Sequence, residues 1–178
     1  MIDGQTVVLR PLAEADEAEA TAAEQELAED GFEFLPDRGD DEAWPAFVAR
    51  IRSQERGEGL PPGYVPATFR VAEVDGRIIG RVSIRHELND HLRRFGGHIG
   101  YGVRPAWRRH GYASEMLRRA LAFCAELGIE PALVTCDDAN TASIGVIENC
   151  GGVPHDRGVG PDGDNTRRYW VPTTIWPA

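Results

Sequence analysis

Basic and small residues meet in one short segment, Arg108–Ser114 (RRHGYAS), in a pattern that could hold an anion. A β-rich run ends at Val103, and an apolar helical pattern begins near Gly111. The first turn of a helix leaves about four backbone N–H groups without partners, and together with the helix dipole these attract anions. Gly111 lets the backbone approach a ligand closely, and the two arginines can add charge-assisted hydrogen bonds. The segment therefore predicts an anion site. The alternative is a strand–turn–helix junction that binds no ligand and whose arginines are solvated.

Charge is distributed unevenly along the chain, and this restricts the partners. The 178 residues carry a formal net charge of −10, and every one of the 19 basic residues is arginine. Residues 13–42 hold thirteen Asp or Glu against one Arg, whereas residues 85–119 hold eight of the arginines. Nonspecific nucleic-acid binding requires the neutralisation of many phosphates, so no nucleic-acid partner is expected. A small polyanion near the arginine-rich part is compatible with this distribution.

Length and composition predict one folded domain spanning residues 1–178. No run of about 18 apolar residues is present, so no membrane association is expected. The first residues lack a basic segment followed by an apolar one, which favours a cytoplasmic protein. Cys124, Cys136 and Cys150 are odd in number and widely spaced, so neither a disulfide framework nor a metal site is expected.

Hydrophobic periodicity and turn residues predict a mixed α/β domain in the order β-α-α-β-β-β-α-β-α-β-β. The Asp75–Gly76 dipeptide between two β-rich runs is a strong hairpin signal. A helix over residues 13–30 has a weak apolar stripe and is expected on the surface. The remaining expected elements are a strand at 5–12, a helix at 39–57, strands at 67–74 and 77–88, a strand at 97–103, a helix at 111–128, a strand at 131–136, a helix at 140–152 and C-terminal strands within 153–178.

The residues RRHGYA (108–113) resemble the Q/R-x-x-G-x-G/A signature of the GCN5-related N-acetyltransferases, the GNAT family. The strand HIGYGVRP leads into this signature, an amphipathic helix and the strand PALVTCDD follow, and NTASIGVIENCGG is similar to the family's Asn-containing block. The similarity covers residues 67–152, whereas residues 5–66 match loosely and would form the acceptor side. It implies a single GNAT-like mixed sheet with splayed central strands, and transfer of acetyl from acetyl-CoA to a primary amine by direct attack.

The resemblance also implies which residues bind the coenzyme. The backbone amides of residues 109–113 would hold the pyrophosphate, and backbone groups of the preceding strand would pair with the pantetheine arm. Asn140 could contact the coenzyme, and it is equally suited to cap the following helix. The implied coenzyme-binding residues are Tyr101, Gly102, Val103, Arg108, Arg109, His110, Gly111, Tyr112, Ala113, Ser114, Asn140 and Ser143.

Amine acetylation needs a base for the ammonium proton, donors for the oxyanion and an acid for the leaving thiolate. Many family members carry a Glu on the strand before the signature, and this position is His98 here. His98 is therefore the first candidate base, followed by Glu87 and His86, and a structural role is the alternative for each. The family's tyrosine acid, seven residues after the conserved Asn, is replaced by Ile147.

The acceptor is expected to be a small-molecule amine or a protein N-terminus. The acidic stretch 13–42 would favour a cationic amine, or it forms a solvated face. The alternative function is a non-catalytic acyl-CoA-binding sensor or interaction module, which the missing tyrosine favours. A nucleotide-binding enzyme that uses the same turn is a third reading. A homodimer is compatible with the sequence.

Overall fold

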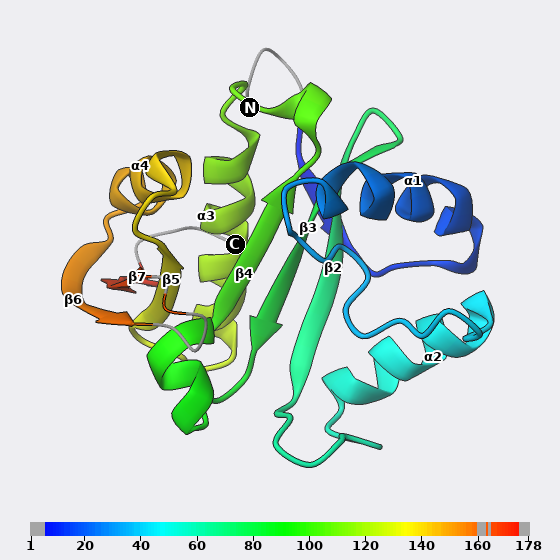
Figure 1. Ribbon diagram of the computed structural model, residues 1–178, viewed down its shortest axis with the longest axis horizontal. Coiled ribbons are helices and arrows are strands. Elements are labelled where there is room, and N and C mark those ends of the chain that lie inside the picture. Colours follow the sequence, from blue (N-terminus) through cyan, green and yellow to red (C-terminus); the bar gives the residue numbers. More distant parts are fainter. Residues whose placement is uncertain (1–5, 160–162, 164, 175–178) are drawn as a thin grey trace.

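The computed structural model describes residues 6–159, 163 and 165–174 of the chain, which form one mixed β-sheet with helices on both faces (Figure 1). The strand order in the sheet is β1-β2-β3-β4-β5-β7-β6. The strands are β1 (Val8–Arg10), β2 (Ala67–Val74), β3 (Arg77–Arg85), β4 (Ile99–Val103), β5 (Ala132–Asp137), β6 (Val153–Val159) and β7 (Asn165–Val171). The helices are α1 (Glu17–Ala28), α2 (Trp44–Glu55), α3 (Tyr112–Glu126) and α4 (Thr141–Asn149), with short helical turns η1 (Glu14–Asp16), η2 (Leu92–Gly96) and η3 (Pro105–Trp107). The predicted fold class and element order are confirmed.

Two apolar clusters hold the helices against opposite faces of the sheet. Val82 and Ile84 of β3 face the side covered by α3 and α4, in the larger cluster. Phe69 and Val71 of β2 face the side covered by α1 and α2, in the second cluster. Because side chains alternate along a strand, β2 and β3 supply both clusters. None of the helices in the described part of the chain is long and apolar enough to cross a membrane.

The hairpin between β2 and β3 forms as its sequence predicts. Asp75 and Gly76 both have positive φ angles, 49° and 75°, which matches the geometry of a two-residue hairpin turn. Eight residue pairs then run from Val74–Arg77 to Ala67–Arg85, with one irregularity after Ala72. This long ladder fixes which β3 side chains lie on each face of the sheet.

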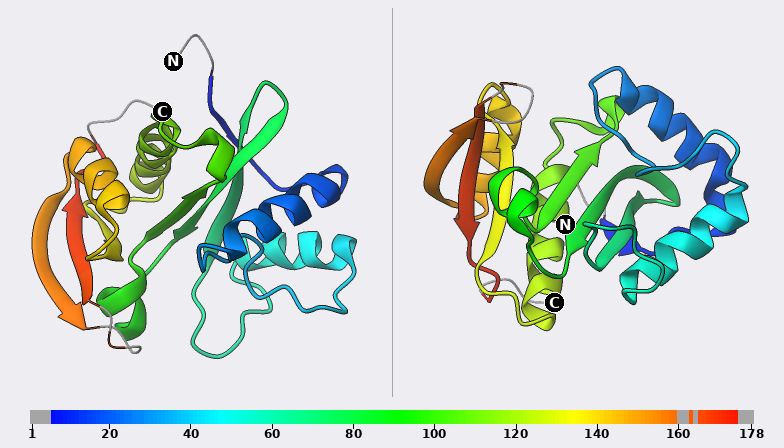
Figure 2. Two further views of the ribbon diagram at one scale, coloured as in Figure 1. Left: turned by 45° about the horizontal axis from the view of Figure 1, so that its top comes forward. Right: turned by 60° about the horizontal axis from the view of Figure 1, so that its bottom comes forward.

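The sheet opens between β4 and β5. These two strands are parallel and share a single registered pair, Ile99 with Val134, whereas β5 and β7 share six. In Figure 2 the two strands separate beyond this pair, so the predicted splaying of the central strands is confirmed. Gly97 makes the closed end possible, because its φ is 62° and a Cβ there would lie 2.7 Å from the Leu133 carbonyl oxygen.

The N-terminal helices differ from their sequence prediction. The segment expected as one helix begins with the turn η1, and only then does α1 start at Glu17. The helix lies on the surface with one face packed against the sheet, where Ala20, Ala23 and Leu27 are buried. Small alanine side chains let the helix approach the sheet closely, and a weak apolar stripe does not reveal such packing.

Candidate active site

The predicted anion segment forms a turn of unusual backbone geometry at the start of α3. Arg109 and Gly111 both have positive φ angles, 65° and 81°, and Gly111 is the N-cap residue. No side chain caps this helix. The first helical bond runs from the Glu115 N–H to the Gly111 carbonyl oxygen at 3.2 Å, so the N–H groups before Glu115 have no partner within the helix. The turn can therefore hold an anion on its backbone.

The two arginines of the turn have different surroundings. The Arg108 Nε donates to the Val103 carbonyl oxygen at 2.9 Å, and its Nη2 pairs with Asp30 beyond α1. Arg108 thus ties the turn to β4 and to the acceptor side of the sheet. Arg109 is exposed and has no ion pair with any described carboxylate, so its charge is available to a ligand.

The other residues of the turn are divided between solvent and core. His110 is exposed and lies with its ring centroid 5.9 Å from that of Tyr112. Tyr112 is buried in the main core, and Ala113 packs partly against it. The Ser114 carbonyl oxygen accepts a hydrogen bond from the Cys150 thiol. Backbone groups, more than side chains, are thus presented to a ligand here.

Along β4, alternate residues turn their backbone groups towards the opening. The Arg104 N–H donates to Ile79 of β3, and the His98 carbonyl oxygen accepts from Arg85. By the alternation of an antiparallel pair, Gly102 also faces β3, whereas Tyr101 and Val103 face the opening. Since Arg108 occupies the Val103 carbonyl oxygen, both backbone groups of Tyr101 and the N–H of Val103 are left for a ligand.

Two further predicted coenzyme residues stand at the start of α4. Asn140 caps this helix, because its Oδ1 accepts from the Ser143 N–H at 2.9 Å. The Tyr101 side chain reaches this region from β4, and its hydroxyl is buried without a hydrogen-bond partner among the described residues. Burial raises the pKa of Tyr101 well above its usual range, and the neighbouring Ser143 hydroxyl offsets this only in part. The family's tyrosine position on α4 is Ile147, which has no hydroxyl and is fully buried in the core.

His98 lies at the closed end of the opening and is only 8 % exposed. Its ring Nδ1 accepts a hydrogen bond from the Leu133 backbone N–H at 2.9 Å, and the His98 backbone N–H donates to the Leu133 carbonyl oxygen at 2.7 Å. Burial, together with the charges of Arg93 and Arg85, lowers the pKa of His98 to about 4. The ring is therefore neutral at pH 7, and its basic nitrogen is already engaged by the backbone.

His86 and Glu87 follow the end of β3. The His86 Nε2 lies 2.8 Å from the Thr68 hydroxyl, which also bonds to Glu55, and burial lowers the pKa of this histidine. Thr68 is paired with Ile84 and shares its face of the sheet, the face covered by α3. Glu87 is exposed, and no described residue pairs with its carboxylate.

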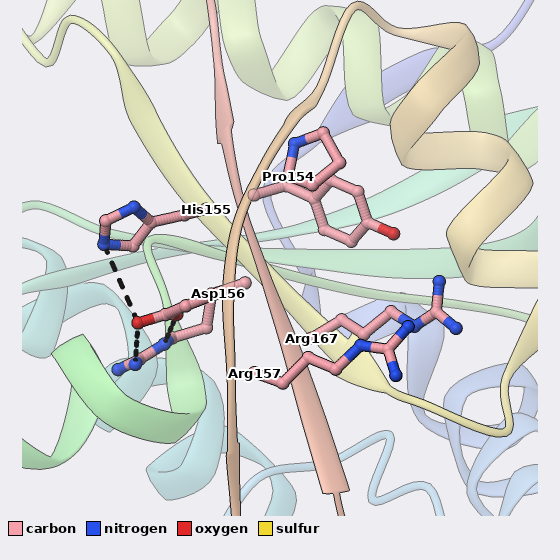
Figure 3. Close-up of a pocket in the computed structure, with 7 residues that line it drawn as sticks. Pro154, His155, Asp156, Arg157 and Arg167 are labelled. Atoms are coloured by element: carbon pink, nitrogen blue, oxygen red, sulfur yellow. Dashed lines mark hydrogen bonds and ion pairs between the residues drawn. The ribbon is translucent and has the colours of Figure 1, made fainter.

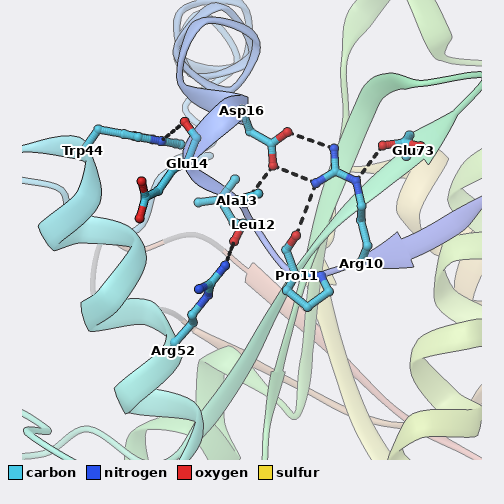
Figure 4. A network of polar contacts seen from close by, with 9 residues as sticks. All are labelled: Arg10, Pro11, Leu12, Ala13, Glu14, Asp16, Trp44, Arg52 and Glu73. Carbon is cyan, nitrogen blue, oxygen red and sulfur yellow. Dashed lines mark hydrogen bonds and ion pairs between the residues drawn. The ribbon is translucent and has the colours of Figure 1, made fainter.

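Five of the thirteen carboxylates in the acidic stretch 13–42 pair with arginines from other elements: Asp16, Glu19, Glu26, Asp30 and Glu42. Figure 4 shows Arg10 of β1 between Asp16 and Glu73. Arg104, only slightly exposed, pairs with Glu26 and Glu19 of α1. These pairs attach the N-terminal helices to the sheet, which gives the stretch a structural role. Glu29, Asp40 and Asp41 of the same stretch are exposed and form no ion pair with a described residue, so an acidic surface for a cationic acceptor stays a prediction.

A separate hollow lies on β6 and β7 and is lined by charged side chains that pair with one another (Figure 3). Asp156 contacts His155 and Arg168, while Arg157 and Arg167 both contact Asp138. In the sheet order, β5 stands between this hollow and β4, and none of the predicted site residues lines it. The described residues also contain no group of three or more His, Cys, Asp or Glu side chains placed to hold a metal ion.

Comparison with known proteins identifies the family. A family model described as an acetyltransferase (GNAT) domain matches residues 6–153. The chain belongs to the GNAT acetyltransferase domain family. The predicted enzyme class, an acetyl-CoA-dependent N-acetyltransferase, is confirmed at the level of this family. No curated protein matches the chain.

Solved structures share the GNAT fold at low sequence identity. RimJ of Mycobacterium smegmatis, in complex with CoA-disulfide, is 21% identical with a TM-score of 0.67, over 97% of this chain and 84% of that one. A ribosomal-protein-S5-alanine acetyltransferase of Vibrio fischeri is 13% identical with a TM-score of 0.70, over 100% and 98%. The spermidine N-acetyltransferase of Vibrio cholerae, in complex with CoA and spermine, is 16% identical with a TM-score of 0.66, over 94% and 96%. Their acceptors differ, so the fold does not identify the acceptor of this GNAT domain.

Proposed function

We propose that this GNAT domain transfers acetyl from acetyl-CoA to a primary amine by direct attack of the amine on the thioester. One observation carries the proposal: the uncapped start of α3 and the open edge of β4 are continuous, because Arg108 joins the turn to Val103. A coenzyme needs both features, an anion site for the pyrophosphate and a strand edge for the amide-bearing arm. Solved structures of the same fold in complex with CoA support the coenzyme class.

In this proposal the N–H groups of residues 109–114 and the Arg109 guanidinium hold the pyrophosphate. The free backbone groups of Tyr101 and Val103 pair with the pantetheine arm. Asn140 orders the start of α4 through its cap and presents its amide NH₂ group, with the Ser143 hydroxyl beside it, to the coenzyme. Acetyl-CoA is consumed in each turnover, so these residues bind a co-substrate.

For the chemical step, the amine nitrogen attacks the thioester carbonyl carbon, the C–S bond breaks, and one proton leaves the nitrogen. We assign the proton acceptor as Glu87, directly or through a water, because its exposed carboxylate follows β3 beside the closed end of the opening. His98 is assigned a positioning role, since its Nδ1 already accepts from Leu133. His86 lies on the α3 side and is the weaker candidate. A backbone N–H of β4 would stabilise the oxyanion.

The second candidate function is a coenzyme-binding module without catalysis. Ile147 in place of the family's tyrosine favours it, because α4 then has no phenol at that position to protonate the leaving thiolate. The buried Tyr101 hydroxyl, which reaches the same region from β4, favours the enzyme, because it is an unpaired donor beside α4.

A thermal-shift titration with acetyl-CoA, CoA and ATP tests the proposal first. A ligand at about 100 times its Kd adds about 2.7 kcal/mol to the free energy of unfolding, which gives a clear shift in midpoint. Stabilisation by both CoA species and not by ATP is the expected result, and equal stabilisation by ATP would indicate a general phosphate site. Release of CoA that depends on an added amine then separates the enzyme from the coenzyme-binding module.

A further inference from the structure

Two arginines on β3, Arg81 and Arg85, lie on the acceptor face of the sheet, and neither forms an ion pair with a carboxylate of the described residues. Side chains two residues apart on a strand share a face, so Ser83 lies between them on the same face. This face is the one covered by α1 and α2, because Arg81 lies 5.8 Å from the centroid of Phe69 in the second cluster. We call Arg81, Ser83 and Arg85 the β3 row.

The end of the β3 row at Arg81 is closely packed and electrostatically incomplete. Arg81 is only 8 % exposed, and its guanidinium lies 4.5 Å from the centroid of Phe32. Its Nη1 donates to the Ser83 hydroxyl oxygen at 2.9 Å, and its Nη2 donates to the Glu33 carbonyl oxygen at 2.5 Å. Its Nε is buried without a partner among the described residues. Burial lowers the pKa of Arg81 to about 10, the charge of Arg85 adds to this, and the charges of Glu33 and Glu24 offset it only in part.

Arg85, at the other end of the row, lies over Gly100 of the neighbouring strand β4. Its Nη1 donates to the Gly96 carbonyl oxygen at 2.9 Å, and no ion pair joins it to any carboxylate in the part of the chain that the structure describes. The residue opposite Ser83 on β4 is Gly100. The three atoms nearest to a Cβ placed on Gly100 all belong to the Arg85 guanidinium, at 3.4 to 4.0 Å. A ligand above Gly100 would therefore contact this guanidinium directly.

A cationic row of this kind is costly unless an anion completes it. Taking a charge out of water destabilises the folded state, and proteins normally offset this cost with a paired opposite charge. Other arginines of this chain obey the rule, since Arg10, Arg50 and Arg104 each pair with a carboxylate. The β3 row departs from this rule, since no described carboxylate forms an ion pair with Arg81 or Arg85.

We infer that the acceptor is an amine that also carries a carboxylate, of the α-amino acid class, and that Arg85 and Ser83 bind this carboxylate. The inference rests on the proposed function. There the coenzyme arm runs along β4 from the turn near Val103 towards Ile99, so its acyl end lies beside Gly100. The carboxylate then sits on the β3 row while the neighbouring amine faces Glu87 and the thioester. An α-amino acid has its amine and carboxylate close together, which suits a site where the Arg85 guanidinium and the acyl end of the coenzyme both lie near Gly100.

The test measures CoA release with free L-amino acids and, for each, the matching carboxamide, with spermidine and a neutral N-terminal peptide alongside. The carboxamide keeps the amine and the side chain and removes only the negative charge. We expect at least one amino acid to exceed its carboxamide in kcat/KM by about 100-fold, the loss that accompanies a missing charged hydrogen bond. Arg85→Met should bring this ratio close to 1, mainly through KM, and Arg85→Lys should restore part of it. Arg56→Gln, at an exposed pair with Glu58 beyond α2, is the matched control and should leave the ratio unchanged.

Several outcomes separate this inference from the proposed function. Turnover with spermidine, the peptide or the carboxamides in preference to free amino acids would overturn the inference and leave the acetyltransferase proposal intact. If no amine releases CoA although acetyl-CoA binds, the proposed catalysis fails. Calorimetry then measures how the amino acids bind to the CoA-bound wild type and to CoA-bound Arg85→Met. Tighter binding to the wild type would support the carboxylate site at Arg85. Equal binding by both proteins, or none, would refute it.

Discussion

Replacing Gly111 with Asp or with Asn separates backbone strain from charge at the proposed pyrophosphate site. Gly111 has a φ of 81° and caps α3. Asp and Asn tolerate this left-handed region better than other side chains do, and each should cost about 1 kcal/mol of folding free energy. The two side chains are nearly equal in size, so the variants differ by one negative charge beside the N–H groups at the start of α3.

That charge sets the expected size of the effect. One unit charge about 5 Å from one phosphate charge, at an effective dielectric constant of about 20, is opposed by about 3 kcal/mol. The dissociation constant of Gly111→Asp for CoA should therefore exceed that of Gly111→Asn by about 100-fold. The N–H groups before Glu115 have no helical partner in either variant, so the backbone donors are matched.

Isothermal titration of CoA into both variants measures this ratio, and thermal unfolding without ligand confirms that both are folded to the same extent. Repeating the titration at higher salt should shrink the difference, because added ions screen exposed charges. Equal affinity of the two folded variants for CoA would refute the assignment of the pyrophosphate to this turn.

Three further predictions concern His98, Glu87 and Asn140. The folded pKa of His98 is about 4 and its ordinary value is 6.5, so between these limits only the unfolded chain binds this proton. The contribution of His98 to stability is thus complete above pH 6.5 and declines as the pH falls towards 4. Urea unfolding from pH 7 to 4.5 should show a weaker decline in stability for His98→Asn, whose side chain can still accept from the Leu133 N–H. Wild-type activity of His98→Asn would show that His98 positions the backbone and is not the base. Glu87→Gln should lower kcat/KM by about 100-fold and remove one ionisation from the pH–rate profile; an unchanged profile would exclude Glu87 as the base. Asn140→Ala should cost about 1 kcal/mol in thermal unfolding, because the Ser143 N–H loses its cap, and should also weaken CoA binding; a loss of stability with unchanged affinity would restrict Asn140 to capping.

Local patterns in the sequence were sufficient for most elements and for the glycine turn at the start of α3. The Asp75–Gly76 hairpin and the start of α3 at Gly111 depend on backbone preferences of a few adjacent residues, and these act within one turn. The element order follows from hydrophobic periodicity in the same way. The turn η2 was not predicted, because a five-residue helical turn is shorter than the window in which periodicity can be read.

The partners of charged side chains were decided only by the tertiary structure. In the sequence, His98 has the features of a base and residues 13–42 those of a free acidic surface. In the fold, the backbone N–H of Leu133 donates to the basic nitrogen of His98, and arginines from distant elements pair with some of the carboxylates, such as Asp16 and Glu26. Arg81 and Arg85, which nothing in the sequence distinguishes from the other arginines, lack such partners. Strand register and burial bring these groups together over tens of residues, and no short-range preference encodes which charges remain unpaired.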